Sequence, residues 1–184
     1  MNPSEYTLIS GAAAGTESTF GEQAEKWGVN EVNITFEGHR DARTRGLKIL
    51  SQSELRHGDV SLAYVGRLMH REYKDSPLFR KVLQSIWHQV DAGEQVFVVG
   101  WIREDGTVKG GTGWGAEVAK LFNKDLYAYD QGKTGWFHWN DLEWRRCETP
   151  PMIEATSFTG TGTRLLEDNG RAAIVALFTR SFGG

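Results

Sequence analysis

The stretch Tyr6-Thr-Leu-Ile-Ser-Gly-Ala-Ala-Ala-Gly-Thr16 decides the fold class of this 184-residue chain. Its first half has the pattern of a short apolar strand, and its second half is a glycine turn that leads into a helical pattern over 16–27. A second strand pattern follows, over 31–36. Strand, glycine turn, helix and strand in this order predict a βαβ unit, because two parallel strands need a crossover between them.

The rest of the chain continues this alternation. Strands are predicted over 95–102, 125–130 and 153–158, and helices over 59–73, 76–90, 113–123 and 166–181. Segment 38–55 is predicted to be a loop with at most a short helix, and segment 131–146 a hairpin or flap. We therefore predict one α/β domain over 1–184, with a doubly wound, mainly parallel five-stranded sheet that carries helices on both faces.

Composition excludes several classes of protein. The chain has 21 Lys and Arg against 24 Asp and Glu, so its net charge of −3 argues against a generally basic nucleic-acid surface. A single cysteine, Cys147, forms no internal disulfide, and His57, His70 and His88 lack the spacing of metal ligands. No metal and no cofactor are therefore expected.

The apolar runs are too short for a helix that spans a membrane. The N-terminal residues also lack the basic and apolar regions of a secretory signal. We expect a cytoplasmic protein with no membrane partner.

Glycine is over-represented, with 22 residues in 184, or about 12% against an average of about 7%. Much of the surplus lies in three turns, at 11–15, 110–115 and 160–162, each placed after a predicted strand. In an open α/β sheet such turns meet at the carboxyl edge, where backbone amides and helix N-termini can hold an anion. The pattern predicts a phosphate site and hence a nucleotide ligand, although short βα turns also need glycine.

Neither familiar nucleotide motif is present, because the chain has no G-x-x-x-x-G-K-[ST] and no G-x-G-x-x-G. Gly110-Gly111-Thr112-Gly113 with Glu117 instead resembles the P-G-G-x-G-T-x-x-E signature of the "lonely guy" phosphoribohydrolases. These enzymes share a Rossmann-like superfamily with DNA-processing protein A. Ile9-Ser10-Gly11, with Gly15, also resembles the opening strand and glycine turn of this superfamily. Lys109 and Trp114 depart from the signature's proline and threonine, so the resemblance reaches the superfamily and no particular branch.

The binding residues predicted from the loops and from this resemblance are Ser10, Gly11, Gly15, Thr16, Gly110, Gly111, Thr112, Gly113, Trp114, Gly160, Thr161, Gly162, Thr163 and Arg164. The glycine amides, the threonine hydroxyls and the Arg164 guanidinium would hold the phosphate. Trp114 interrupts a glycine loop and would face the base, as Trp101 also could. Alternatively, Arg164 is an ordinary surface arginine, and the tryptophans serve in packing.

Three further residues are candidates. The resemblance implies that Glu117 orients the ribose or stabilises oxocarbenium character, although a glutamate near a helix N-terminus can also be there for the helix dipole. Asp130 closes a predicted strand and could activate water or cap a turn. His39 follows the second strand and heads a basic stretch with Arg40, Arg43 and Arg45 that could hold a phosphate or a polynucleotide, or be a solvated loop.

Two functions from different classes follow. The first is a nucleotide-processing hydrolase that breaks an N-glycosidic bond, with Glu117 and Asp130 as catalytic residues. The second is a binding module without catalysis, which senses or sequesters a nucleotide signal or binds nucleic acid. The resemblance also implies a homodimer.

Overall fold

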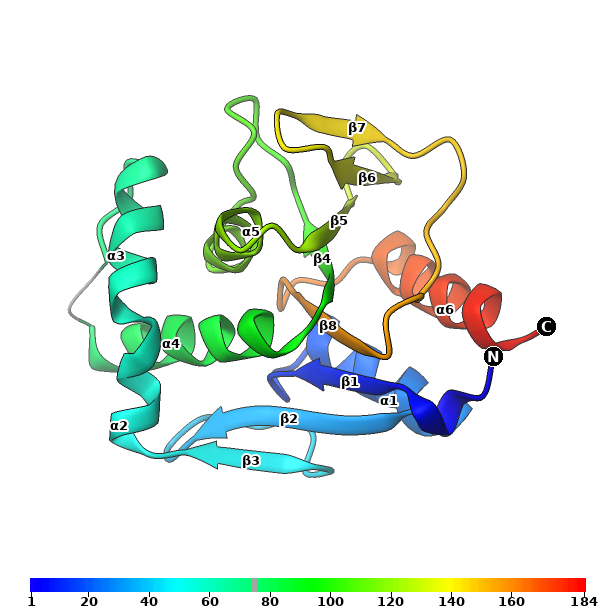
Figure 1. The fold of residues 1–184 in the computed structure, drawn as a ribbon, viewed down its shortest axis with the longest axis horizontal. Helices are drawn as coiled ribbons and strands as arrows, with labels where there is room; N and C mark the ends of the chain where they lie inside the picture. The colour runs from blue at the N-terminus through cyan, green and yellow to red at the C-terminus, as the bar shows by residue number, and fades with distance from the viewer. Residues whose placement is uncertain (74–75) are drawn as a thin grey trace.

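One eight-stranded sheet forms the centre of the molecule, in the order β3-β2-β1-β8-β4-β5-β6-β7 (Figure 1). The computed structural model describes residues 1–73 and 76–184. The strands are β1 Thr7–Ser10, β2 Asn30–Phe36, β3 Leu47–Leu50, β4 Gln95–Gly100, β5 Asp125–Asp130, β6 Gly135–Trp139, β7 Trp144–Arg146 and β8 Ser157–Gly162. Neighbours from β3 to β5 pair in parallel, whereas β6 and β7 are antiparallel additions at one edge.

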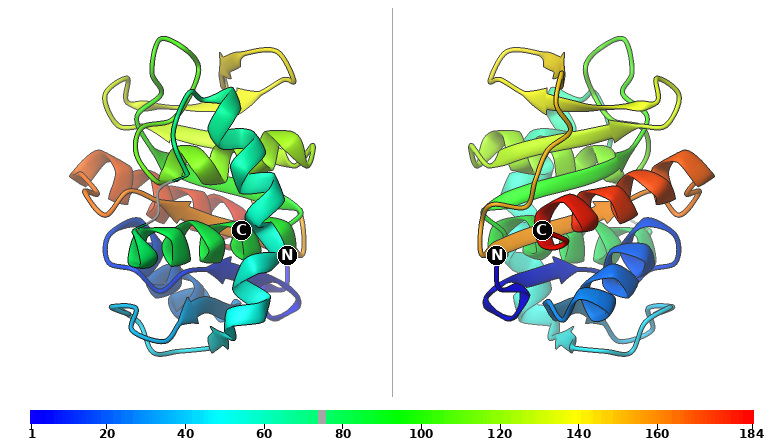
Figure 2. Two further views of the ribbon diagram at one scale, coloured as in Figure 1. Left: turned by 90° about the vertical axis from the view of Figure 1, so that its left-hand side faces the viewer. Right: turned by 90° about the vertical axis from the view of Figure 1, so that its right-hand side faces the viewer.

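Helices cover both faces of this sheet. They are α1 Thr16–Trp27, α2 Gln52–Leu55, α3 Asp59–Leu68, α4 Pro77–Ala92, α5 Thr112–Leu121 and α6 Asp168–Phe182, with 3-10 turns η1 Pro3–Glu5 and η2 Arg56–Gly58. Figure 2 shows α1 and α6 on one face, with α3, α4 and α5 on the other. Ser76 occupies the N-cap position of α4, without a side-chain capping bond in the described residues, and Pro77 begins the helix as the sequence predicts, because proline fits the first helical turn.

The central strand β4 separates two hydrophobic cores. Phe97 and Val99 pack with α1 and α6, whereas Val96 and Val98 pack with α3, α4 and α5. Alternate residues of a strand point to opposite faces, so a strand buried on both faces is apolar throughout. The uninterrupted apolar run of β4 is thus explained.

The predicted five-stranded, mainly parallel Rossmann-like sheet is wrong, because the sheet is mixed and has eight strands. Segment 38–55, predicted to be a loop with at most a short helix, contains the short helix α2 and also the unpredicted strand β3. β3 was missed because it is an edge strand whose Leu47 and Ile49 stay exposed, so it has no buried alternation. Segment 131–146 is indeed a hairpin, and its strands extend the sheet by pairing β6 with β5.

The third predicted glycine turn is also wrong in part. Gly160 and Gly162 lie within β8, which pairs with both β1 and β4. A side chain at Gly160 would place its Cβ 2.4 Å from the ring of Phe20 on α1. This glycine therefore allows close packing between a strand and a helix, and its role is not that of a phosphate loop.

No helix in the described part of the chain is long and apolar enough to cross a membrane.

Candidate functional site

A cavity of about 570 Å³ lies at the carboxyl edge of the parallel strands. Its lining comes from the segments that follow β1, β2, β4 and β8, and from α4 and the start of α5. The lining residues are Gly11, Ala13, Glu17, Gly38, His39, Arg40, Ser76, Leu78, Phe79, Val82, Ser85, Ile86, Gln89, Trp101, Lys109, Gly110, Gly111, Thr112, Gly162, Thr163, Arg164 and Leu165. The volume is typical of pockets that hold small organic ligands.

A buried carboxylate fills the first glycine turn. Glu17, in the first turn of α1, is 6% exposed and lines the cavity. Its Oε2 accepts a hydrogen bond from the amide of Ala13 at 2.9 Å, and its Oε1 accepts one from the hydroxyl of Thr161 at 2.9 Å. Burial raises the pKa of Glu17 above 4.5, although these hydrogen bonds and the charges of His39 and Arg164 oppose the shift.

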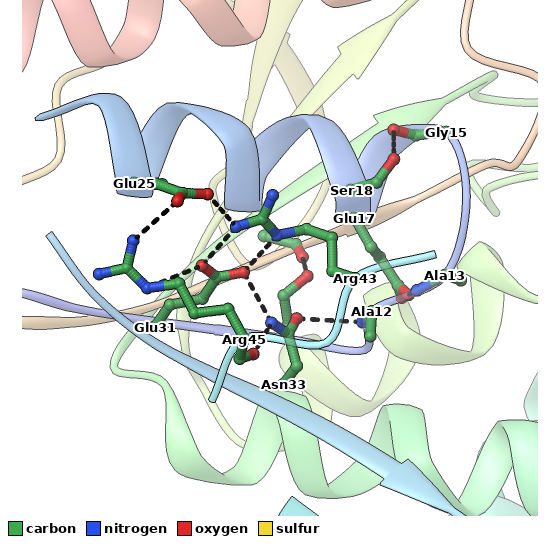
Figure 3. A network of polar contacts seen from close by, with 12 residues as sticks. Ala12, Ala13, Gly15, Glu17, Ser18, Glu25, Glu31, Asn33, Arg43 and Arg45 are labelled. Carbon is green, nitrogen blue, oxygen red and sulfur yellow. Dashed lines mark hydrogen bonds and ion pairs between the residues drawn. The ribbon is translucent and has the colours of Figure 1, made fainter. Parts of the chain in front are cut away.

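The same turn is fastened from outside by a polar network (Figure 3). The amide of Ala12 donates to Oδ1 of Asn33 at 3.1 Å, and Nδ2 of Asn33 donates to Glu31 at 2.6 Å. Arg43 donates to both carboxylate oxygens of Glu31, from Nε at 2.6 Å and from Nη2 at 2.8 Å. The Glu31 side chain is fully buried on β2, so this charge pair fixes the segment after β2 against that strand. Nη2 of Arg43 also donates to Glu25 on α1 at 2.9 Å, and the amide of Arg43 donates to the carbonyl of Ala12 in the first glycine turn.

That segment carries His39 into the cavity wall. Nδ1 of His39 lies 2.7 Å from Oδ1 of Asp41, and the hydroxyl of Thr35 donates to the same oxygen at 2.6 Å. The His39 side chain is 6% exposed. An aspartate beside Nδ1 fixes the tautomer that has its proton there, which leaves a lone pair on Nε2.

The opposite rim, Lys109 to Thr112, is open. Gly110 has φ +70°, and among the described residues no atom lies within 4 Å of the position that a Cβ would take at Gly110 or Gly111. Arg71 braces this rim from behind, donating to the carbonyls of Val108 and Gly110. The amides of Gly110, Gly111 and Thr112 donate to no protein atom in the described residues, as expected before the first bonded turn of α5.

The structure brings about half of the predicted binding residues to the cavity. Those that line it are Gly11, His39, Gly110, Gly111, Thr112, Gly162, Thr163 and Arg164. Ser10, Gly15, Thr16, Gly113, Trp114, Gly160 and Thr161 do not line it. Several of these form internal contacts instead: the hydroxyl of Ser10 donates to the carbonyl of Gly160 at 2.7 Å, and that of Thr16 to the carbonyl of Thr163 at 2.8 Å.

Trp114 is not a base platform, because it is 3% exposed and packs in the core beside Tyr73. Trp114 belongs to α5, so its side chain packs with this helix against the sheet and does not enter the cavity. Trp101 does line the cavity, with Nζ of Lys109 5.3 Å from its ring centroid.

The two predicted catalytic residues lie outside the lining. Glu117 pairs with Lys120 at 2.7 Å, and Lys120 also donates to the carbonyl of Gly106. Asp130 accepts hydrogen bonds from the amides of Ile102 and Lys133, both at 2.8 Å. These bonds match the alternative role given above for Asp130, that of capping a turn. Their positions give the predicted catalytic roles no support.

Sequence reasoning missed Glu17, Asp41 and Gln89. Glu17 looks like an ordinary first-turn glutamate, and only the return of β8 beside β1 buries it. Of these three residues, only Asp41 has a signal in the sequence: it lies two residues after His39, and a His-x-Asp spacing can orient an imidazole. Gln89 lines the cavity from α4 while its buried Oε1 has no protein partner in the described residues.

The basic stretch after β2 is largely neutralised within the fold. Arg43 and Arg45 both pair with Glu25 and Glu31, so only Arg40 of the three arginines faces the cavity. The described residues hold no group of three or more His, Cys, Asp or Glu side chains that could bind a metal ion.

Comparison of the chain with protein-family models, with curated proteins and with solved structures finds no match.

Proposed function

We propose that this protein binds a nucleotide or a nucleotide-derived phosphate compound in the cavity at the carboxyl edge of its sheet. The observation that carries the proposal is the convergence of His39, Arg40, Lys109 and Arg164 on a cavity whose rim includes three unpaired amides. A phosphate satisfies such amides and the positive end of α5 together, which water does less well.

The phosphate belongs at the open rim. Lys109 and the amides of Gly110 to Thr112 supply charge and donors there, and Arg164 enters from the segment after β8. The first glycine turn is unsuitable, because the carboxylate of Glu17 already accepts from its amide at Ala13. Leu78, Phe79 and Val82 of α4 provide the apolar surface that a base or sugar face needs.

Binding of a small nucleotide is favoured over binding of nucleic acid. A polynucleotide site needs a stripe of free cations along the surface, and the pairing of Arg43 and Arg45 with carboxylates removes the stripe that the sequence suggested. The hydrolase and the sensor both remain as uses of one binding site, and they differ in what happens to the ligand.

The test is calorimetric titration with nucleoside mono-, di- and triphosphates, followed by chromatography of each mixture after incubation. We expect micromolar or tighter binding of at least one nucleotide, and competition by inorganic phosphate. Recovery of intact nucleotide after binding would support a sensor, and free base with ribose phosphate would support a hydrolase. Binding of none of them, or salt-sensitive binding of single-stranded nucleic acid alone, would contradict the proposal.

A further inference from the structure

The cavity is lined by a buried carboxamide to which the fold gives no partner. Gln89 lies in the last turn of α4, lines the cavity and is 1% exposed. Its Oε1 has no hydrogen-bond partner in the described residues. The hydroxyl of Thr159 donates to Gln89 at 2.6 Å, but the acceptor is the main-chain carbonyl and the side chain stays unbonded. Because buried polar groups are normally hydrogen-bonded, this amide is a place where a ligand can supply the missing partner.

Other buried polar side chains of the cavity are already bonded within the fold. Each carboxylate oxygen of Glu17 accepts a hydrogen bond, from Ala13 or from Thr161. The hydroxyl of Ser85 donates to the carbonyl of Val82 at 2.7 Å. Gln89 differs from both, since its amide offers a donor and an acceptor that the described residues leave unused.

Gln89 lies over the first glycine turn, at a distance from the phosphate rim that suits a base. A Cβ added at Gly11 would collide with Nε2 of Gln89, so the amide fills the space that a side chain would take there. In the sheet, β8 separates β1 from β4, so the segments after β1 and β4 start two strand spacings apart, or about 10 Å. The sugar of a nucleotide held by its phosphate at the start of α5 ends short of Gln89, and the base continues toward it.

The face of α4 that lines the cavity has the character of a base site. Its lining residues recur every three or four positions and end at the carboxamide: Leu78, Phe79, Val82, Ser85, Ile86 and Gln89. A nucleobase has apolar faces and an edge on which donors and acceptors lie side by side. A base with its face against Val82 and Ile86 would present that edge to Gln89.

We propose that Gln89 reads the base of the ligand, an inference that rests on the proposed nucleotide site. Oε1 accepts a hydrogen bond from an N–H of the base edge, and Nε2 donates to the neighbouring ring nitrogen or carbonyl oxygen. A nucleotide with such an edge satisfies the buried amide, whereas a ligand without a donor leaves Oε1 unpaired. Gln89 is therefore a specificity-determining residue of the site.

The test compares two buried glutamines that share the same defect. Gln23 on α1 is 9% exposed and its Oε1 also has no partner in the described residues, but it does not line the cavity. Gln89→Met and Gln23→Met each replace an amide by an apolar chain of similar length. We expect neither variant to lower the melting temperature, because neither change removes a hydrogen bond that the fold makes.

Calorimetry then measures affinities for the 5′-monophosphates of adenosine, guanosine, cytidine and uridine, and for ribose 5-phosphate. Gln89→Met should weaken the best-bound nucleotide by about tenfold or more, and ribose 5-phosphate by less than about threefold. Gln23→Met should change no affinity by more than about twofold.

A second measurement uses the wild-type protein and does not depend on the folding of a variant. Purine riboside 5′-monophosphate keeps the phosphate, the sugar and the ring faces of a purine nucleotide, but it offers no N–H on its base edge. Wild-type protein should bind it about tenfold or more weakly than the best-bound nucleotide, because Oε1 of Gln89 then stays unpaired.

The outcomes separate this inference from the proposed function. Ribose 5-phosphate or purine riboside 5′-monophosphate that binds as tightly as the best nucleotide overturns the role of Gln89 and leaves the phosphate site standing. Equal losses of affinity in Gln89→Met and Gln23→Met also overturn that role. Failure of every compound to bind overturns both proposals.

Discussion

Two glycine turns of similar composition behave differently in this molecule. Around Gly11 to Gly15, the amide of Ala12 donates to Asn33, that of Ala13 to Glu17 and that of Thr16 to the carbonyl of Thr163. Around Gly110 to Thr112, the amides have no partner in the described residues, and the glycines face open space. The first turn is filled by the protein itself, and the second is open.

The difference shows that glycine content alone does not define an anion site. A glycine turn before a helix always presents amides, but a carboxylate in the first turn of the helix can satisfy them. In the first turn that carboxylate is Glu17. In α5 the glutamate is Glu117, the sixth residue of the helix, whereas Glu17 is the second residue of α1. Glu117 pairs with Lys120 instead, so the amides of that turn have no partner in the described residues.

The largest effect on the filled turn is expected from removing the polar network that holds it from outside. Arg43→Ala leaves the fully buried Glu31 side chain without its main partner, so we expect a loss of about 3 kcal/mol in unfolding free energy. Arg45→Ala removes a half-exposed arginine 3.9 Å from the same carboxylate and should cost less than about 1 kcal/mol. Urea unfolding of both variants makes the comparison, and equal losses would contradict the role of the network.

Adding a methyl group to each glycine turn should show directly which turn is packed and which is open. Gly15 has φ +90°, and a Cβ there would lie 2.6 Å from the carbonyl oxygen of Arg164, so Gly15→Ala should destabilise by about 2 kcal/mol. Gly111 has φ −61° and open space, so Gly111→Ala should change stability by less than about 0.5 kcal/mol. Thermal unfolding measures both, and a large loss in Gly111→Ala would show that the second turn is also packed.

The open turn should instead respond in binding. Lys109→Ala removes a cation from the rim and should weaken nucleotide binding by about tenfold, in the range of one charge-assisted hydrogen bond. Lys26→Ala removes an exposed lysine in the last turn of α1, away from the cavity, and should leave the affinity unchanged. Calorimetry at one fixed salt concentration is the measurement, and equal effects would mean that only net charge matters.

The carboxylate of the filled turn should also be visible in the pH dependence of stability. Burial raises the pKa of Glu17 above 4.5, so the folded protein keeps a proton that the unfolded chain has released. Stability is therefore lost as pH rises from 4.5 through the folded pKa, and Glu17→Gln should gain stability relative to wild type over this range. Urea unfolding at about pH 5 and about pH 8 measures this, with Glu22→Gln on the exposed side of α1 as control. A stability difference between Glu17→Gln and wild type that is the same at both pH values would contradict this expectation.

Local patterns determined much of the fold. The apolar run of β4, the Ser76-Pro77 start of α4 and the strand–turn–helix order at the N-terminus all gave the correct elements, because each depends on neighbours in the chain. Gly11, Gly110 and Gly162 also meet at one edge, since parallel strands share their carboxyl end, although Gly160 lies within β8.

The sequence by itself therefore determined an α/β chain with helices on both faces and glycine-rich turns at one edge of its sheet. Tertiary structure alone decided the number of strands, because edge strands such as β3 gain their place by pairing and not by burial. It also decided which glycine turn is open. Of the two donors to Glu17, Ala13 is four residues away, but Thr161 is 144 residues away, and the amide of Ala12 finds its acceptor 21 residues away at Asn33. The filling of the turn therefore depends in part on contacts that no local pattern contains.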